Sequence, residues 1–312
     1  MDGRIKKLGI ASVCIIFVIL FTVLSLFIPL GAMLFPLIAT SLTAYVYIRC
    51  GKIASAINVV LTTGAMLLFT MDVESLLIVA LSVIPGIVSG LMISKRKDYY
   101  STLFGVSIAF LVVFLGTLLM AGRGLEGGVG GIIDQSIGGL KEALLIAGNN
   151  EATAELEMAL SVTGAYIKQM FPTFIILTSL VFAYLHSVLL RILAKRVSKI
   201  RYNYISLDEH HAPRHVAVAY FIISIFALFL SGESKIGVAV YNIVAIIDFV
   251  LAFCGFSFIE SKFKNKIKFG FLRAIIYIAV FLVASSFAIQ LLSIIGMLDS
   301  FMNYRRIERN GE

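Results

Sequence analysis

Residues 75–97 read SLLIVALSVIPGIVSGLMISKRK, an apolar run of 20 residues closed by Lys95-Arg96-Lys97. A helix of about 20 apolar residues spans the hydrocarbon core of a bilayer, and basic residues gather at the cytoplasmic ends of such helices. The run is therefore expected to be a membrane-spanning helix that ends in the cytoplasm. Pro85-Gly86 inside it predicts a kink, at a point where the helix can line a cavity.

Similar runs recur along the whole chain, whose 312 residues are 60% hydrophobic and only 14% charged. The mean hydropathy is +1.00. Soluble domains average about 45–50% apolar and about 25% charged residues, so this chain has too little polar surface to cover a soluble core. A soluble enzyme is excluded. Because open strand edges do not survive in lipid, the sequence predicts an all-α, polytopic helical protein of the cell membrane, with the lipid bilayer as its first partner.

Nine membrane-spanning helices are expected, with eight or ten as open alternatives. They cover about residues 8–28, 30–48, 53–71, 75–94, 100–121, 166–190, 216–232, 237–260 and 271–296. The chain divides accordingly into a five-span bundle (1–121), a glycine-rich acidic extracytoplasmic loop (122–165), a four-span bundle (166–296) and a polar tail (297–312).

The expected loop carries a second pattern. Apolar residues recur in it at helical spacing, at Ile133, Ile137, Leu140, Leu144 and Leu145. An amphipathic helix on the membrane and a flexible linker are equally compatible with this pattern.

Basic residues indicate the orientation of the chain. With the N-terminus in the cytoplasm, 19 of the 26 Lys and Arg residues lie on the cytoplasmic side, as the positive-inside rule requires. Because these charges lie at the ends of apolar runs, we interpret the net charge of +8 as a topology signal and expect no nucleic-acid partner. The tail is discordant, since nine spans place it outside although Arg305, Arg306 and Arg309 favour the cytoplasm.

Asp248 lies midway along the eighth expected span and is the strongest candidate for a ligand or ion path. A charge at that depth costs about 2.5–3.5 kcal/mol on insertion scales, so such residues face a helix bundle or a water-filled path. A hydrogen-bonded contact between helices is the alternative interpretation. Ala245, Ala252 and Gly255 lie on or near the same helical face, which favours a position facing the bundle.

Two intramembrane amides, Asn58 and Asn242, are weaker candidates for the same path. Each lies toward the end of its expected span, where water or a neighbouring carbonyl satisfies an amide. His186, close before Arg191, is expected at the membrane interface.

The densest polar stretch is Asp208-Glu209-His210-His211-Ala212-Pro213-Arg214-His215. Three imidazoles and two carboxylates are a possible ligand set for a transition metal. The adjacent His210 and His211 lack the i, i+4 spacing of a helix-borne site, so a solvated loop is favoured and no metal or cofactor is expected. No G-x-x-x-x-G-K-[ST], H-E-x-x-H or G-x-S-x-G motif occurs in the chain. Enzymatic activity is not expected.

Two further stretches carry a family resemblance. Met170-Phe171-Pro172 leads through an apolar span and a basic stretch to Leu207–Pro213, and the chain ends with Gly296-Met-Leu-Asp299-Ser-Phe301-Met-Asn-Tyr304-Arg305-Arg306. In these stretches the chain resembles the YybS-like family of bacterial membrane proteins. The positions that match the family motifs are Pro172, Glu209, Pro213, Asp299 and Arg305, whereas His210 and His211 replace a Trp and an Arg of the family.

The resemblance also implies a function, because the N-terminal half of that family is similar to the S components of energy-coupling-factor vitamin transporters. It implies a transporter-like component that binds a small nutrient and is energised by a separate coupling subunit and ATPases. The alternative is a membrane scaffold or regulator that binds protein partners and has no substrate.

Overall fold

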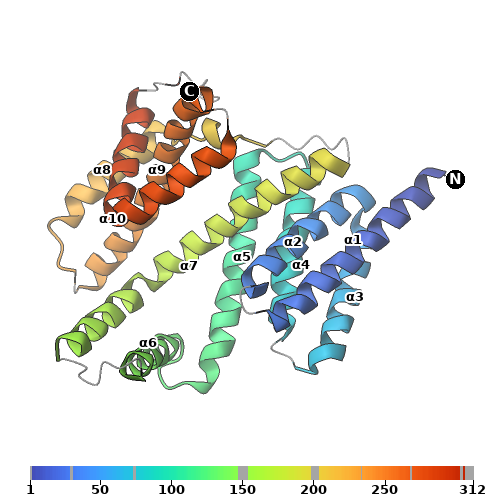
Figure 1. The fold of residues 1–312 in the computed structure, drawn as a ribbon, viewed down its shortest axis with the longest axis horizontal. Helices are drawn as coiled ribbons and strands as arrows, with labels where there is room; N and C mark the ends of the chain where they lie inside the picture. Colours follow the sequence, from blue (N-terminus) through green and yellow to red (C-terminus); the bar gives the residue numbers. More distant parts are fainter. Residues whose placement is uncertain are drawn as a thin grey trace. The chain divides into compact units, whose positions relative to one another are not determined.

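The computed structural model describes residues 2–28, 31–72, 75–146, 154–197, 204–232, 234–267, 269–302 and 305. All regular structure in these ranges is helical (Figure 1), so the all-α prediction is confirmed. The elements are α1 (Asp2–Phe27), α2 (Gly31–Cys50), α3 (Lys52–Thr70), α4 (Ser75–Ser94), α5 (Tyr99–Ala121), η1 (Gly122–Gly124), α6 (Val129–Ile146), α7 (Ala154–Val197), η2 (Leu207–Glu209), α8 (Arg214–Ala227), α9 (Lys235–Lys266) and α10 (Gly270–Met302).

Seven helices of the described chain are long and apolar enough to cross a membrane, namely α1–α5, α7 and α9. Two further apolar helical stretches are shorter, α8 with its 14 residues and the segment Phe287–Met302 at the end of α10. Each of the nine expected spans thus corresponds to a helix, and over the described residues seven of these helices qualify as membrane crossings.

Local signals explain several helix ends. The Asp98 carboxylate accepts a hydrogen bond from the backbone N–H of Ser101 at 2.9 Å and so caps α5. This bond and one from the Ser101 hydroxyl hold the pKa of Asp98 below its usual value. Ser234 caps α9 in the same way, by accepting from the N–H of Gly237. Such caps satisfy amide groups that have no partner within the helix.

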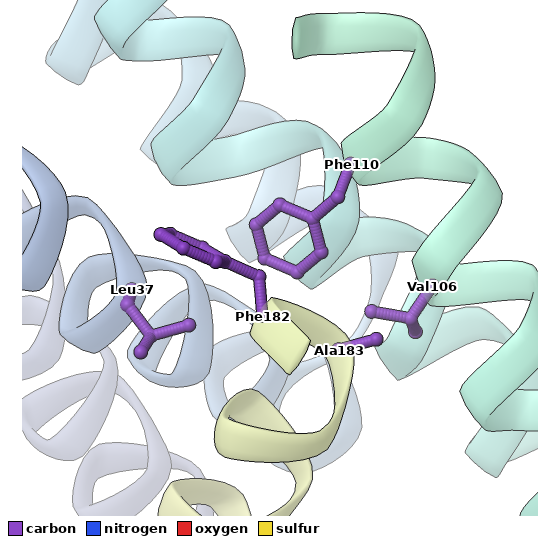
Figure 2. Packing of buried hydrophobic residues seen from close by; sticks show 5 residues of the cluster. All are labelled: Leu37, Val106, Phe110, Phe182 and Ala183. Carbon is purple, nitrogen blue, oxygen red and sulfur yellow. The ribbon is translucent and has the colours of Figure 1, made fainter. Parts of the chain in front are cut away.

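The chain forms two compact units, residues 1–204 and 205–312. The predicted division at residue 166 therefore differs from the structure, because α7 belongs to the first unit. Phe182 and Ala183 of α7 pack with Leu37 of α2 and with Val106 and Phe110 of α5 (Figure 2). The apolar face of α7 is covered by these two helices, and the boundary falls after α7 ends.

The expected loop over residues 122–165 is largely helical, and of the two alternatives for it the structure has the helix. It contains η1, α6 and the first turns of α7, a helix of 44 residues. Ile133 is buried, Lys168 pairs with Asp134 at 2.6 Å, and Lys141 pairs with Glu157. The residues with helical spacing thus form a helix, α6, that packs on α7, whereas residues 147–153 lie outside the described chain.

α10 does not form the single straight span that was expected over residues 271–296. Near its start, the Tyr277 ring lies 4.7 Å from that of Phe256. Leu292 lies much further along α10, yet its backbone contacts Gly255, the neighbour of Phe256. A straight helix would carry residue 292 about 22 Å beyond residue 277. α10 must therefore reverse its direction, and Figure 1 shows it as two limbs that meet at a sharp bend.

Candidate functional site

α4 is a continuous helix that contains Pro85, and hydroxyl groups of α2 bind its backbone beside this proline. Pro85 has no backbone N–H, so the carbonyl of Leu81, four residues earlier, loses its partner within the helix. Thr40 Oγ1 donates to this carbonyl oxygen at 2.7 Å, and Thr43 Oγ1 donates to the Ser82 carbonyl at 3.3 Å. The kink predicted from Pro85-Gly86 thus lies against a neighbouring helix that supplies the missing hydrogen bond.

Two glycines of α4 allow this close approach. A Cβ atom on Gly86 would lie 2.5 Å from the carbonyl oxygen of Thr40, and one on Gly90 would lie 2.6 Å from Tyr47 Cβ. Both distances are too short for any larger residue. The spacing of four residues therefore creates a smooth face that packs directly on α2.

Asn58 of α3 joins the same contact. Its Nδ2 donates to Thr43 Oγ1 at 3.1 Å, and its Oδ1 accepts from Thr62 Oγ1 at 3.4 Å. The side chain is fully buried, and hydroxyl groups of the protein satisfy its amide. We call Thr40, Thr43, Asn58, Thr62 and Ser82 the α2–α4 polar cluster; none of the five carries a charge.

Three buried hydroxyls around this cluster have no hydrogen-bond partner among the described residues. They belong to Ser82 of the cluster, to Ser55 on α3 and to Ser89 on α4, each at most 2% exposed. Ser55 lies one turn before Asn58 and Ser89 lies two turns after Ser82, so these hydroxyls extend the polar faces of both helices.

His186 of α7 is a buried polar residue, whereas the sequence predicts it at the membrane interface. It is fully buried, its Nδ1 lies 3.1 Å from Ser41 Oγ, and its ring lies edge-on to Phe110. The sequence carries no signal for this position, because it depends on how α7 packs against α2 and α5.

A cavity of about 380 Å³ lies in the first unit between α1, α2 and α7. Gly9, Val13 and Phe17 line it from α1, and Leu42 and Tyr45 line it from α2. Small-molecule sites measure about 300–1,000 Å³. The cavity therefore has the size of a small-ligand site with a predominantly apolar lining.

Asp248, in the second unit, contacts a neighbouring helix. Its Oδ1 accepts a hydrogen bond from the Tyr220 hydroxyl of α8 at 2.8 Å, and its side chain is half-buried. This geometry is that of a hydrogen-bonded contact between helices, the alternative interpretation of Asp248. A role of Asp248 in an ion path stays a prediction. Asn242 donates to the Val238 carbonyl of its own helix. Arg273, a conceivable partner for Asp248, pairs instead with Glu260 at 3.1 Å.

The family-motif positions of the second unit come together around Arg305. Its guanidinium pairs with Asp299, with Nη2 and Oδ2 2.5 Å apart, and both side chains are almost fully buried. Nη1 donates to the Asp208 carbonyl and the Ser257 hydroxyl, and Nη2 donates to the His210 carbonyl. We call Asp208, His210, Ser257, Asp299 and Arg305 the Arg305 cluster.

The remaining motif positions have other roles. The Glu209 carboxylate accepts from the Ser206 N–H in a capping box over η2, and Pro213 is the N-cap residue of α8. Both shape the connection that Arg305 holds. Pro172 lies within α7, in the first unit.

The three histidines of the predicted polar stretch do not converge. The His210 ring is buried edge-on against Phe253, whereas His215 is exposed. Burial, together with the charge of Arg305, lowers the pKa of His210 to about 4. Nowhere in the described chain do three or more His, Cys, Asp or Glu residues gather as metal ligands would.

Comparison with known proteins identifies one relationship. Residues 15–300 match a family model whose description is "Predicted membrane protein (DUF2232)". No curated protein and no solved structure matches the chain.

Proposed function

Since the chain belongs to this family of predicted membrane proteins, we propose that it is a transporter-like component that binds a small nutrient, as the S components of energy-coupling-factor transporters do. The α2–α4 polar cluster carries the proposal. Polar groups buried in a membrane are costly and mark functional sites, and this cluster lies beside a proline within a spanning helix. The apolar cavity beside α2 supplies the space for the nutrient.

In this proposal the chain has no enzymatic activity of its own. A separate coupling subunit and ATPases in the cell membrane supply the energy for transport, because the sequence has no phosphate-binding loop.

The proposed function is tested by thermal unfolding of the purified protein with a panel of vitamins. A ligand that binds only the folded state at about 100 times its Kd raises stability by about 2.7 kcal/mol. Gly9 lines the cavity and has open space around it, so Gly9→Leu is expected to fill the cavity and abolish the shift. Gly64→Leu, in an equally open and exposed position on α3, is the matched control. The absence of a shift with every vitamin would contradict the proposal.

We further propose that the N-terminus and the tail both lie in the cytoplasm, with nine apolar segments between them. Lys264 pairs with the Asp208 side chain and Arg305 binds the Asp208 backbone. The start of the tail therefore lies beside the basic connection before α8. The reversal of α10 thus removes the conflict between a nine-span count and the arginines of the tail; Arg306 and Arg309 lie outside the described residues.

Single cysteines at Gly128, Lys266 and Met302, in a chain without Cys14, Cys50 and Cys254, test this topology. A membrane-impermeant thiol reagent is expected to label position 128 from outside intact cells. Positions 266 and 302 should react only after the membrane is opened. Labelling of position 302 from outside would refute the cytoplasmic tail, and equal labelling of positions 128 and 266 would refute the orientation.

A membrane scaffold or regulator is the second candidate function. The Arg305 cluster favours it, because four of its polar contacts hold the connection over residues 205–213 in one conformation. An ordered connection of this kind is a surface that a protein partner can recognise.

A further inference from the structure

The α2–α4 polar cluster consists of buried polar groups from three helices, and hydrogen bonds link four of its residues. We propose that it binds a monovalent alkali cation such as Na⁺. This inference deepens the proposed transporter-like function and rests on it for its biological role, as an ion coupled to the nutrient.

The oxygen atoms form a connected set. Thr43 Oγ1 lies 3.1 Å from Asn58 Nδ2 and 3.3 Å from the Ser82 carbonyl oxygen, and Thr62 Oγ1 lies 3.4 Å from Asn58 Oδ1. These hydrogen bonds are at the long end of the normal range. Hydroxyl, amide and carbonyl oxygens are the neutral ligands that alkali cations take at interrupted membrane helices.

Ser82 provides an independent observation. Its Oγ is completely buried on the α4 face that meets α2 and has no partner among the described residues. Buried polar atoms are almost always hydrogen-bonded, and an exception indicates an ion or water. A cation beside Ser82 would satisfy this oxygen, together with the Ser82 carbonyl that already faces Thr43.

The composition of the cluster selects the ligand class. A divalent cation requires carboxylate ligands to offset its desolvation, and the cluster has none. An anion would meet the carbonyl oxygens of Leu81 and Ser82, which only accept. A nutrient is too large for this crossing, because even one carbon atom on Gly86 would lie 2.5 Å from the Thr40 oxygen. Neutral oxygen ligands favour a single small positive charge.

The test measures thermal unfolding and ²²Na⁺ binding of the purified full chain, starting in choline chloride. NaCl is exchanged for choline chloride at constant ionic strength, with LiCl and KCl as parallel series. We expect a saturable rise in Tm with NaCl. Thr62→Ala and Ser82→Ala each remove one oxygen and are expected to raise the half-saturating Na⁺ concentration at least tenfold, whereas Thr62→Ser retains the response.

Ser179→Ala is the matched control, because this buried hydroxyl donates to the Ile175 carbonyl of its own helix. It is expected to leave Na⁺ binding unchanged. If Thr62→Ala does not fold, the test rests on Ser82→Ala, because this variant removes a hydroxyl that has no hydrogen bond among the described residues.

Equal Tm values in NaCl and choline chloride, or wild-type Na⁺ affinity in Ser82→Ala, would overturn the cation site. Stabilisation by a vitamin without any effect of Na⁺ would overturn the site and leave the proposed function standing. Na⁺ binding without any vitamin effect would support the site and count against the nutrient.

Discussion

Arg305→Met is expected to destabilise the second unit by about 3–5 kcal/mol, because it removes one partner of a buried ion pair. The carboxylate of Asp299 would stay buried without a cation, and the carbonyls of Asp208 and His210 would lose their donors. Cys254 is buried in the same unit, so its rate of alkylation during heating reports the unfolding. Cys14 and Cys50 are replaced by serine for this measurement.

Two further variants make this prediction specific. Lys141→Met breaks an exposed ion pair with Glu157 in the first unit, and exposed pairs contribute little to stability. Lys141→Met is expected to leave the rate of Cys254 alkylation during heating unchanged. Arg305→Met combined with Asp299→Leu removes both charges and should regain part of the lost stability. If Arg305→Met behaves like Lys141→Met, the buried pair does not stabilise the unit.

Gly255→Leu is expected to separate α9 from the second limb of α10. A Cβ atom on Gly255 would overlap the Leu292 carbonyl oxygen, and one on Gly296 would overlap the Leu251 carbonyl oxygen. Inserting even one or two carbons into a packed core costs about 1–3 kcal/mol, and here backbone atoms have to move. The alkylation rate of Cys254, which packs beside Leu251, measures the loss.

Gly116→Leu is the matched control for this substitution. Gly116 lies on α5, is partly exposed and has no atom within 4 Å of the position that a Cβ atom would take. Its replacement is expected to leave stability unchanged. Wild-type protection of Cys254 in Gly255→Leu would show that α9 and α10 do not cross at these glycines.

The fold was predictable from the sequence where hydrophobicity decides it. Apolar runs bounded by charges located α2–α5 within one or two residues, and Pro85 marked where α2 binds the backbone of α4. The reversal of α10 was not predictable, because the stretch between Tyr277 and Leu292 contains no Pro or Gly. The contacts of Leu292 and Gly296 with α9 define that reversal, and no local pattern encodes them.

The candidate sites were predictable only in part. Asn58, Asp299 and Arg305 were identified as residues, but their partners were not. Arg305 binds the Asp208 carbonyl across 97 positions of the chain, a contact that only the folded structure creates. The same reason explains why the burial of His186 was not predicted. The sequence shows which residues are polar, but it does not show which of them contact one another in the fold.

The short length of α8 has a consequence for the lipid around it. The 14 residues of α8 reach about 21 Å as a helix. The hydrocarbon core of a bilayer is about 30 Å thick. Hydrophobic mismatch of this size is relieved when the bilayer thins or the protein oligomerises. We therefore expect the second unit to be more stable in lipids with short acyl chains than in lipids with long ones.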